Sequence, residues 1–177
     1  MLQPTLNQQL RSILILVIII CLPLTATAQG YKQKQFNKMV HNLLDHTVPE
    51  INAKLAKYDS SIIYLDAREL NEFNISKIEN AKWVGYTDFD LTRVENLDKN
   101  QPIIVYCSVG YRSEKITERL KENGFTNISN MTGGLFEWVN FKKPILNSNN
   151  EITKKIHAFD KEWGKWLDES IVEKVYN

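Results

Sequence analysis

The sequence has few of the residues that would build a disulfide-stabilised or metal-bound domain. It holds two cysteines and three histidines among 177 residues. Two cysteines cannot supply the disulfide framework of a small secreted scaffold, and with three scattered histidines they do not indicate a structural zinc site. We therefore expect the fold to depend on an ordinary apolar core, which a chain of this length can build as one domain.

The chain also has little net charge, because its 22 lysines and arginines nearly balance its 21 acidic residues. Such a balance gives no electrostatic reason to expect nucleic acid or an anionic membrane as the main partner. The 43% of hydrophobic and 24% of charged residues are typical of a globular protein. This composition excludes a disordered chain and a polytopic membrane protein.

Long apolar runs are absent apart from one near the N-terminus, over residues 13–22. This run is about half the length that a membrane-spanning helix needs. Arg11 precedes it, Pro23 ends it, and residues 26–28 (ATA) follow as a small-x-small end. These features are typical of a secretory signal peptide, so we predict residues 1–28 to be one. It would export the chain to a bacterial periplasm and leave no membrane attachment after cleavage.

An uncleaved N-terminal anchor is the alternative to a cleaved signal peptide. A lipoprotein signal anchored at Cys21 is disfavoured, because Ile20 rather than a small residue precedes the cysteine. Cleavage after Ala28 would remove Cys21 and leave Cys107 as the single cysteine. In an oxidising compartment such a cysteine has no internal disulfide partner, and it is either a buried apolar side chain or a reactive thiol.

Apolar periodicity predicts strands that alternate with helices, which indicates an α/β fold with an open, mostly parallel sheet. Strands are expected at residues 61–65, 81–85, 102–106 and 127–129. Helical segments are expected within 29–47 and 48–58 and at 67–80, 113–123, 135–141 and 151–171. The predicted organisation after the signal peptide is a helical lead-in (29–47), a main domain (48–143) and a C-terminal loop with a docked helix (144–177).

The segment from Cys107 to Ser113 (CSVGYRS) lies between the second long buried strand and a helix. Ligands of open α/β sheets bind at the carboxyl ends of the strands, so the loop is placed for a site. Its backbone N–H groups, the positive end of the following helix and the Arg112 guanidinium favour an anion. They would stabilise a Cys107 thiolate, the nucleophilic form. The alternative is a structural cysteine, with Arg112 in an ordinary surface pair.

This loop resembles the active-site loop of the rhodanese-like sulfurtransferase family, and three further segments resemble that family in the same order. Asp66-Ala67-Arg68 with Glu72-Phe73 is similar to its D-x-R-x-x-x-E-F segment. Residues 75–85 resemble its G-H-I-x-G-A segment, with Ser76-Lys77 and Glu79-Asn80 in place of Gly-His and Pro-Gly. Gly133-Gly134 and Trp138 resemble its closing G-G-x-x-x-W. The resemblance covers roughly residues 48–143.

The resemblance implies a rhodanese-like fold, with a mostly parallel sheet of about five strands flanked by helices. It also implies a sulfurtransferase that needs no metal or organic cofactor. Cys107 would take sulfur from a thiosulfate- or persulfide-type donor as a persulfide and pass it to a thiol or to cyanide. An exported thiolate risks overoxidation, so a reducing partner protein is expected as well.

The resemblance assigns roles to the neighbouring residues too. The loop would bind the persulfide and the departing anion through its N–H groups, as an oxyanion hole does. The loop residues are Ser108, Val109, Gly110, Tyr111, Arg112 and Ser113. Arg112 would orient an anionic donor. Asp66, Arg68 and Glu72 are expected to support the loop, with Glu72 as the acid that pairs with Arg68.

Other functions stay open at this point. Phosphatases and arsenate reductases use the longer C-x5-R spacing, whereas Arg112 is the fifth residue after Cys107. A catalytically weak rhodanese-like binding or redox-sensing module is the main alternative. In the tail, Trp163 and Trp166 favour a docked helix, or a lid or partner surface beside the active site. Nothing in the spacing supports a pair between Cys107 and His157.

Overall fold

Five parallel strands form the sheet of the computed structural model, which describes residues 30–176. The strands are β1 (Glu50–Asn52), β2 (Ile63–Asp66), β3 (Lys82–Trp83), β4 (Ile103–Tyr106) and β5 (Ile128–Thr132), in the spatial order β1-β5-β4-β2-β3. The expected α/β fold with a parallel sheet of about five strands is confirmed. The predicted signal peptide, residues 1–28, lies outside the described residues.

The chain divides into two units, Met1–Lys38 and Met39–Asn177. Residues 30–38 of the first unit are helical. The second unit begins with helical residues 39–43 and contains the sheet and all the elements described below. Within residues 30–176, no helix has the length and the apolar character that crossing a membrane would require.

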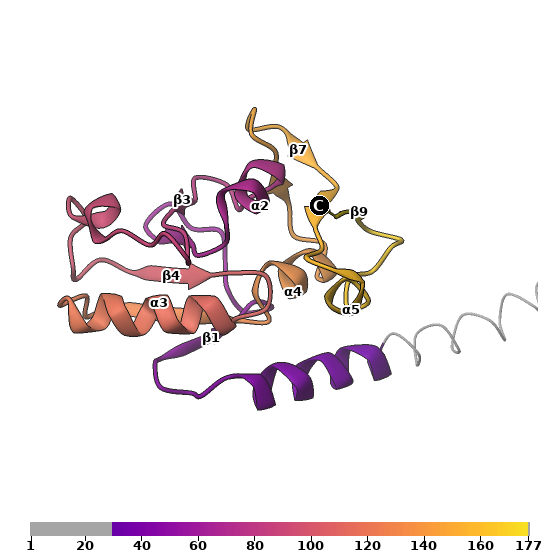
Figure 1. Cartoon of the computed structure of the whole chain (residues 1–177), viewed down its shortest axis with the longest axis horizontal. Helices are drawn as coiled ribbons and strands as arrows, with labels where there is room; N and C mark the ends of the chain where they lie inside the picture. Colours follow the sequence, from indigo (N-terminus) through magenta and orange to yellow (C-terminus); the bar gives the residue numbers. More distant parts are fainter. Residues whose placement is uncertain (1–29, 177) are drawn as a thin grey trace, which may run out of the picture. The chain divides into compact units, whose positions relative to one another are not determined.

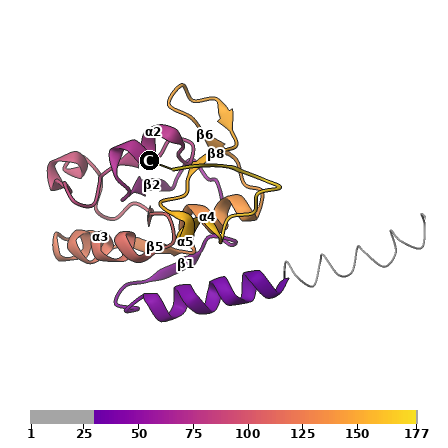
Figure 2. The same ribbon diagram turned by 45° about the vertical axis from the view of Figure 1, so that its right-hand side comes forward.

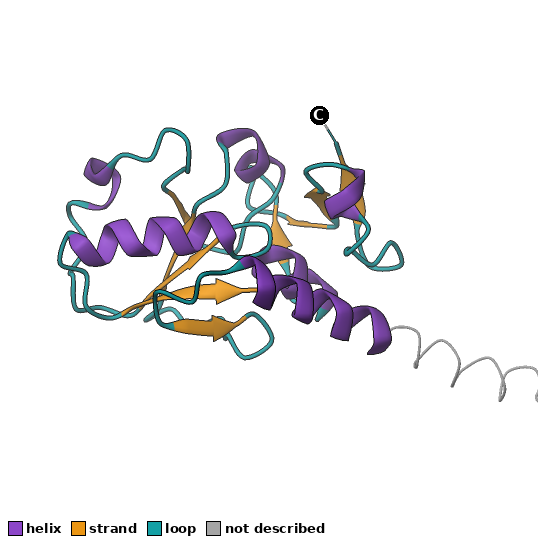
Figure 3. Cartoon of the chain, turned by 60° about the horizontal axis from the view of Figure 1, so that its bottom comes forward, coloured by secondary structure: helices purple, strands orange, loops and turns teal. Residues whose placement is uncertain are grey.

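Helices flank the sheet of the second unit. They are α2 (Leu70–Ile75), the 3₁₀ helix η1 (Leu91–Val94), α3 (Tyr111–Glu122), α4 (Gly134–Asn140) and the one-turn α5 (Lys161–Gly164). The long helix α3 packs along β4 and β5 and lies beside β4 in Figure 1. Figure 3 shows the same long helix covering one face of the sheet.

The sheet buries an apolar core against α3. All four residues of β4 are buried, as its continuous run of apolar and aromatic side chains predicts for a central parallel strand. Ile116 and Leu120 lie one turn apart on α3 and are fully buried in the same cluster as Val105 and Leu65. The core therefore fixes the end of β4 relative to the start of α3, which are the two ends of the Cys107 loop.

The C-terminal segment differs from the prediction. A helix over residues 151–171 was expected, but β7 (Ile152–Thr153) pairs with β6 (Ile145–Leu146), and β8 (Lys155–His157) pairs in parallel with β9 (Glu173–Val175). Only α5 is helical within this stretch. The expected docked helix of residues 144–177 is therefore wrong.

The physical reason is that pairing between distant segments replaces the local helical pattern. Phe159 has a φ of 65°, in the left-handed region that the interior of a right-handed helix excludes. Asp160 caps α5 by accepting the backbone N–H of Trp163 at 2.9 Å, so a new helix begins after the strand. Figures 1 and 2 show α5 beside α4, where Asn140 donates to the Trp166 carbonyl at 2.9 Å.

The turn before α4 fixes the backbone of the Cys107 loop. The N–H groups of Gly133, Leu135 and Phe136 donate to the carbonyls of Val109, Cys107 and Ser108 at 3.0, 2.9 and 3.0 Å. Gly134 has a φ of 52°, and a Cβ on it would meet the carbonyl oxygen of Cys107 and lie 2.6 Å from the Ser108 carbonyl group. A glycine is therefore required where α4 approaches the loop.

We expect Gly134→Ala to lower the free energy of unfolding by roughly 2–4 kcal/mol, because it adds a backbone overlap to a strained φ. Urea unfolding would measure this effect. Gly124→Ala is the matched control, since Gly124 also has a positive φ (89°) but its Cβ would meet only the Lys99 side chain, at 3.5 Å. Equal losses in the two variants would contradict the requirement for close approach at Gly134.

Candidate active site

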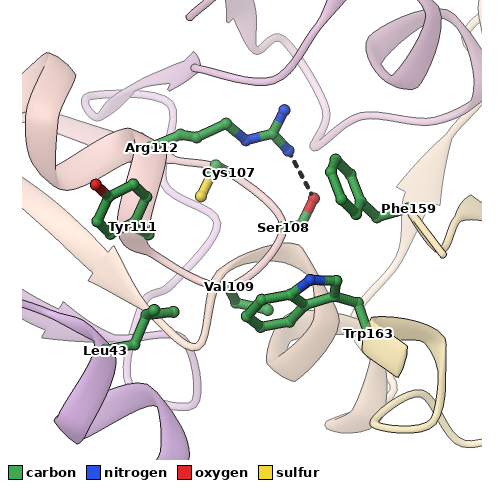
Figure 4. A pocket seen from close by; sticks show the side chains of 8 residues that line it. All are labelled: Leu43, Cys107, Ser108, Val109, Tyr111, Arg112, Phe159 and Trp163. Atoms are coloured by element: carbon green, nitrogen blue, oxygen red, sulfur yellow. Dashed lines mark hydrogen bonds between the residues drawn. The ribbon is translucent and has the colours of Figure 1, made fainter. Parts of the chain in front are cut away.

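Cys107 follows β4 directly, at the carboxyl end of a central strand of the sheet. Its side chain is 1% exposed and lines a pocket of about 160 Å³. In Figure 4 the sulfur points into the space between the labelled side chains. The Gly110 N–H donates to Cys107 Sγ at 3.1 Å. The cysteine therefore lines a pocket and accepts a backbone hydrogen bond.

The loop carbonyls point away from the sulfur. The Gly110 carbonyl accepts hydrogen bonds from Ser113 Oγ at 3.0 Å, Asn130 Nδ2 at 3.1 Å and the Glu114 N–H at 3.0 Å. Gly110 reaches this arrangement with a φ of 124°, as the N-cap of α3. The N–H groups of the first helical turn have no partners within the helix, so the loop presents donors toward an anion.

Not every predicted loop residue reaches the pocket. Among the described residues, the loop positions after Cys107 that line it are Ser108, Val109, Tyr111 and Arg112. Ser113 is fully buried behind the loop, where its hydroxyl lies 2.7 Å from Asn130 Oδ1. The Ser113 side chain therefore supports the loop from behind, and the predicted role of its backbone N–H in anion binding stays a prediction.

Arg112 is paired with a buried carboxylate. Its Nη1 and Nη2 donate to Glu72 Oε2 and Oε1 at 2.5 and 2.9 Å, and Nη2 also donates to Ser108 Oγ at 3.0 Å. Ser108 Oγ in turn donates to Glu72 Oε1 at 3.1 Å. Burial opposes the charge on both groups, but the pairing raises the pKa of Arg112 and lowers the pKa of Glu72 to about 2. Both side chains are therefore charged near neutral pH.

This pairing corrects the prediction that Glu72 pairs with Arg68. Arg68 is fully buried and instead binds Asp66, with Nε and Nη2 at 2.9 and 2.6 Å from the two carboxylate oxygens. Arg68 Nη2 also donates to the Ser76 carbonyl at 2.5 Å. Asp66 and Arg68 thus tie the end of β2 to residue 76 and do not line the pocket within the described part of the chain.

The C-terminal segment brings three further residues to the site. Phe159 and Trp163 line the pocket, and the Phe159 ring centre lies 5.8 Å from the Arg112 guanidinium carbon. Figure 4 shows the two rings beside Val109 and Ser108. The buried His157 has Nδ1 3.8 Å from Glu72 Oε1, so it lies beside the partner of Arg112.

The signal for these residues in the sequence is weak. The aromatic tail favours a docked helix or a lid beside the site, but a helical pattern does not indicate which rings reach the pocket. Leu43, which also lines the pocket, had no signal because it was one apolar position in a helical pattern. Across residues 30–176, no group of three or more histidine, cysteine, aspartate or glutamate side chains is arranged to hold a metal ion.

Comparisons with solved structures agree on the fold. The chain is similar to a rhodanese-like domain from Anabaena sp., with a TM-score of 0.51 and 23% identity, covering 56% of this chain and 79% of that one. It is also similar to a thiosulfate sulfurtransferase from Pseudomonas aeruginosa, with a TM-score of 0.51 and 20% identity, covering 76% and 26% of the two chains. At these identities the likeness shows the fold alone.

The chain is also similar in sequence to curated proteins. It is 35% identical over 122 residues to the tRNA uridine(34) hydroxylase of Wigglesworthia glossinidia brevipalpis, a match that covers 64% of this chain and 37% of the relative. It is 26% identical over 128 residues to the Escherichia coli protein of the same name, covering 70% and 36%. The chain thus spans little more than a third of the length of these relatives.

A family model described as the rhodanese-like domain matches residues 47–141, which is more than half of the chain. The matched range contains the parallel sheet, the Cys107 loop and the Gly133-Gly134 turn, so sequence and fold point to one family. The chain therefore belongs to the rhodanese-like domain family.

Proposed function

We propose that this protein is a sulfurtransferase that carries sulfane sulfur on Cys107 as a persulfide. The observation that carries the proposal is the position of Cys107 Sγ, which faces a pocket and accepts the Gly110 N–H at 3.1 Å. A thiolate in this position has a hydrogen-bond donor for its charge and space for an incoming sulfur atom. The donor would be a thiosulfate- or persulfide-type compound, and the acceptor a thiol or cyanide.

The transfer balances without any other reactant. In the first step the Cys107 thiolate attacks the outer sulfur of a persulfide R–S–SH, and the bond between the two donor sulfurs breaks. The electron pair of that bond leaves with R–S⁻, and the proton stays on the transferred sulfur. In the second step an acceptor thiolate attacks the outer sulfur of the Cys107 persulfide and restores the Cys107 thiolate. The loop N–H groups would hold the sulfur that carries the charge.

The hydroxylase activity in the names of the curated relatives is not part of this proposal. The chain matches 37% of the length of the Wigglesworthia protein, so a domain is shared rather than a whole enzyme. The net charge of +1 also supplies no excess of positive charge for tRNA. Export by residues 1–28 remains part of the proposal. So does a reducing partner protein, which would return an oxidised Cys107 to the thiolate. Such a partner can do so only while oxidation has stopped at the sulfenic acid.

The Arg112–Glu72 pair has a positioning role in this proposal. It joins α2 to the first turn of α3 through a buried carboxylate, and it includes the hydroxyl of the loop residue Ser108. Because Arg112 donates to Glu72 with both terminal nitrogens, the guanidinium holds the loop at the edge of the pocket that it lines. Loss of the carboxylate would leave a largely buried cation without its partner.

We expect the full chain to gain one sulfur atom on Cys107 when it is reduced and then treated with thiosulfate or a small persulfide. Intact mass spectrometry would detect the gain, and a thiol reductant would reverse it. Cys107→Ser is the control, because it keeps Cys21 and should gain no sulfur. If no donor adds sulfur to the wild type, the transferase proposal fails and the binding or redox-sensing module is favoured.

We expect Glu72→Gln to lower the free energy of unfolding at pH 7 by roughly 3 kcal/mol, since it leaves Arg112 without its carboxylate. The folded-state pKa of Glu72 is about 2, below the ordinary value of 4.5. Its stabilisation is therefore complete above pH 4.5 and is lost as the pH falls toward 2. Urea unfolding between pH 7 and 2 should show the two proteins converging in stability at the acid end.

Glu162→Gln serves as the control for this titration. Glu162 forms an exposed pair with Lys165 at 3.0 Å, which should contribute little to stability at any pH. A difference between wild type and Glu72→Gln that stays constant from pH 7 to pH 2 would contradict the assigned ionisation of Glu72.

A further inference from the structure

The pocket over Cys107 is mostly apolar. Among the described residues, five of the eight side chains that line it are apolar or aromatic, namely Leu43, Val109, Tyr111, Phe159 and Trp163. Its volume of about 160 Å³ is close to the roughly 150 Å³ of an apolar cavity that accepts one benzene molecule. The space beside the sulfur therefore suits an apolar group of about the size of one ring.

The charge of the cation at the pocket is already balanced by a buried carboxylate. Arg112 is the one charged side chain among the described lining residues, and both of its terminal nitrogens donate to Glu72. The Ser108 hydroxyl is also bound to Glu72 Oε1, at 3.1 Å. A thiosulfate dianion would lose its water here and meet the loop N–H groups and a guanidinium whose charge Glu72 already balances.

Hydrogen bonds fix the backbone that carries the two aromatic rings. The N–H of Phe159 donates to His157 Nδ1 at 3.2 Å, at the end of β8, and the Phe159 ring lies against the Arg112 guanidinium. The N–H of Trp163 donates to Asp160 Oδ1 at 2.9 Å. A preformed apolar surface binds a matching group without the entropic cost of ordering its own side chains.

We propose that this pocket selects small sulfur donors that carry an apolar, ring-sized group, and that Phe159 and Trp163 determine this selectivity. The inference rests on the proposed sulfur transfer and names its substrate class: organic persulfides and thiosulfonates are used in preference to thiosulfate. The apolar group lies against the two rings while its sulfane sulfur reaches Cys107. Burial of that group supplies the binding free energy that thiosulfate lacks.

A matched series of donors tests the selectivity. Benzenethiosulfonate, methanethiosulfonate and thiosulfate all carry a terminal sulfane sulfur on an oxidised sulfur atom. The Cys107 thiolate forms a bond to that terminal sulfur of R–SO₂–S⁻, the original sulfur–sulfur bond breaks, and its electron pair leaves with the sulfinate R–SO₂⁻. No proton, oxidant or reductant is needed. The two thiosulfonates differ only in the apolar group R, whereas in thiosulfate R is O⁻ and the leaving group is sulfite.

We expect kcat/KM of the full chain for sulfur transfer to cyanide to be at least about tenfold higher with benzenethiosulfonate than with methanethiosulfonate, and lowest with thiosulfate. Phe159→Ala with Trp163→Ala should reduce this ratio to near one. Tyr58→Ala is the matched control, because Tyr58 is 49% exposed, like Phe159 at 51%, and lies outside this pocket. The control should keep the wild-type ratio.

A binding measurement separates the inference from the proposed transfer. Benzenesulfinate should slow the alkylation of Cys107 by iodoacetamide more than methanesulfinate does, and the double variant should lose this difference. Equal kcat/KM for the donors, or a preference that survives in the double variant, overturns the selectivity while transfer stands. If no donor transfers sulfur, the proposed function fails. Protection by benzenesulfinate would then still support the apolar subsite, and absence of protection would overturn that as well.

Discussion

The site depends on the hydrogen bonds that turn the loop carbonyls away from Cys107. Backbone N–H groups at the start of α4 donate hydrogen bonds to the carbonyls of Cys107, Ser108 and Val109. The side chains of Ser113 and Asn130 donate to the carbonyl of Gly110. With its oxygens bound behind it, the loop can direct N–H groups toward the sulfur. The same contacts explain two sequence features at once, since Gly134 has no room for a Cβ and Ser113 is needed behind the loop rather than in the pocket.

Two buried carboxyl groups near this loop show how hydrogen-bond and ion-pair partners determine the pKa of a buried acid. Glu72 and Glu137 are both almost fully buried, and burial alone raises the pKa of each. Glu72 faces the Arg112 guanidinium, and this pairing lowers its pKa to about 2. Glu137 accepts the Asn52 amide at 2.9 Å, which offsets burial only in part, so its pKa stays raised at about 7. Glu72 is therefore the charged carboxylate of the two, and it balances the charge of Arg112, the one cation among the described residues that line the pocket.

The strand, loop and helix around Cys107 could be predicted because their signals are local. The apolar run of β4, the flexible Gly110 and the spacing of Ile116 and Leu120 all lie within one stretch of sequence. The partner of Glu72 could not be predicted in this way. Arg68 is paired with Asp66, two residues earlier in the chain. Glu72 instead binds Arg112, which lies on α3 and comes near only when the chain folds. The prediction of a helix in the C-terminal segment is wrong for the same reason. β8 and β9 pair across 15 intervening residues, and no local periodicity indicates such a pairing.

The selective part of the site therefore comes from outside the elements that support the chemistry. The sheet, the Cys107 loop and α4 hold the sulfur and its donors, and they belong to the segment that the family model matches. Phe159 and Trp163 come from the C-terminal segment beyond it, and they contribute apolar surface to the pocket. Because the two parts are separate in sequence, the tail can change the shape and polarity of the pocket while the loop geometry that supports Cys107 stays the same.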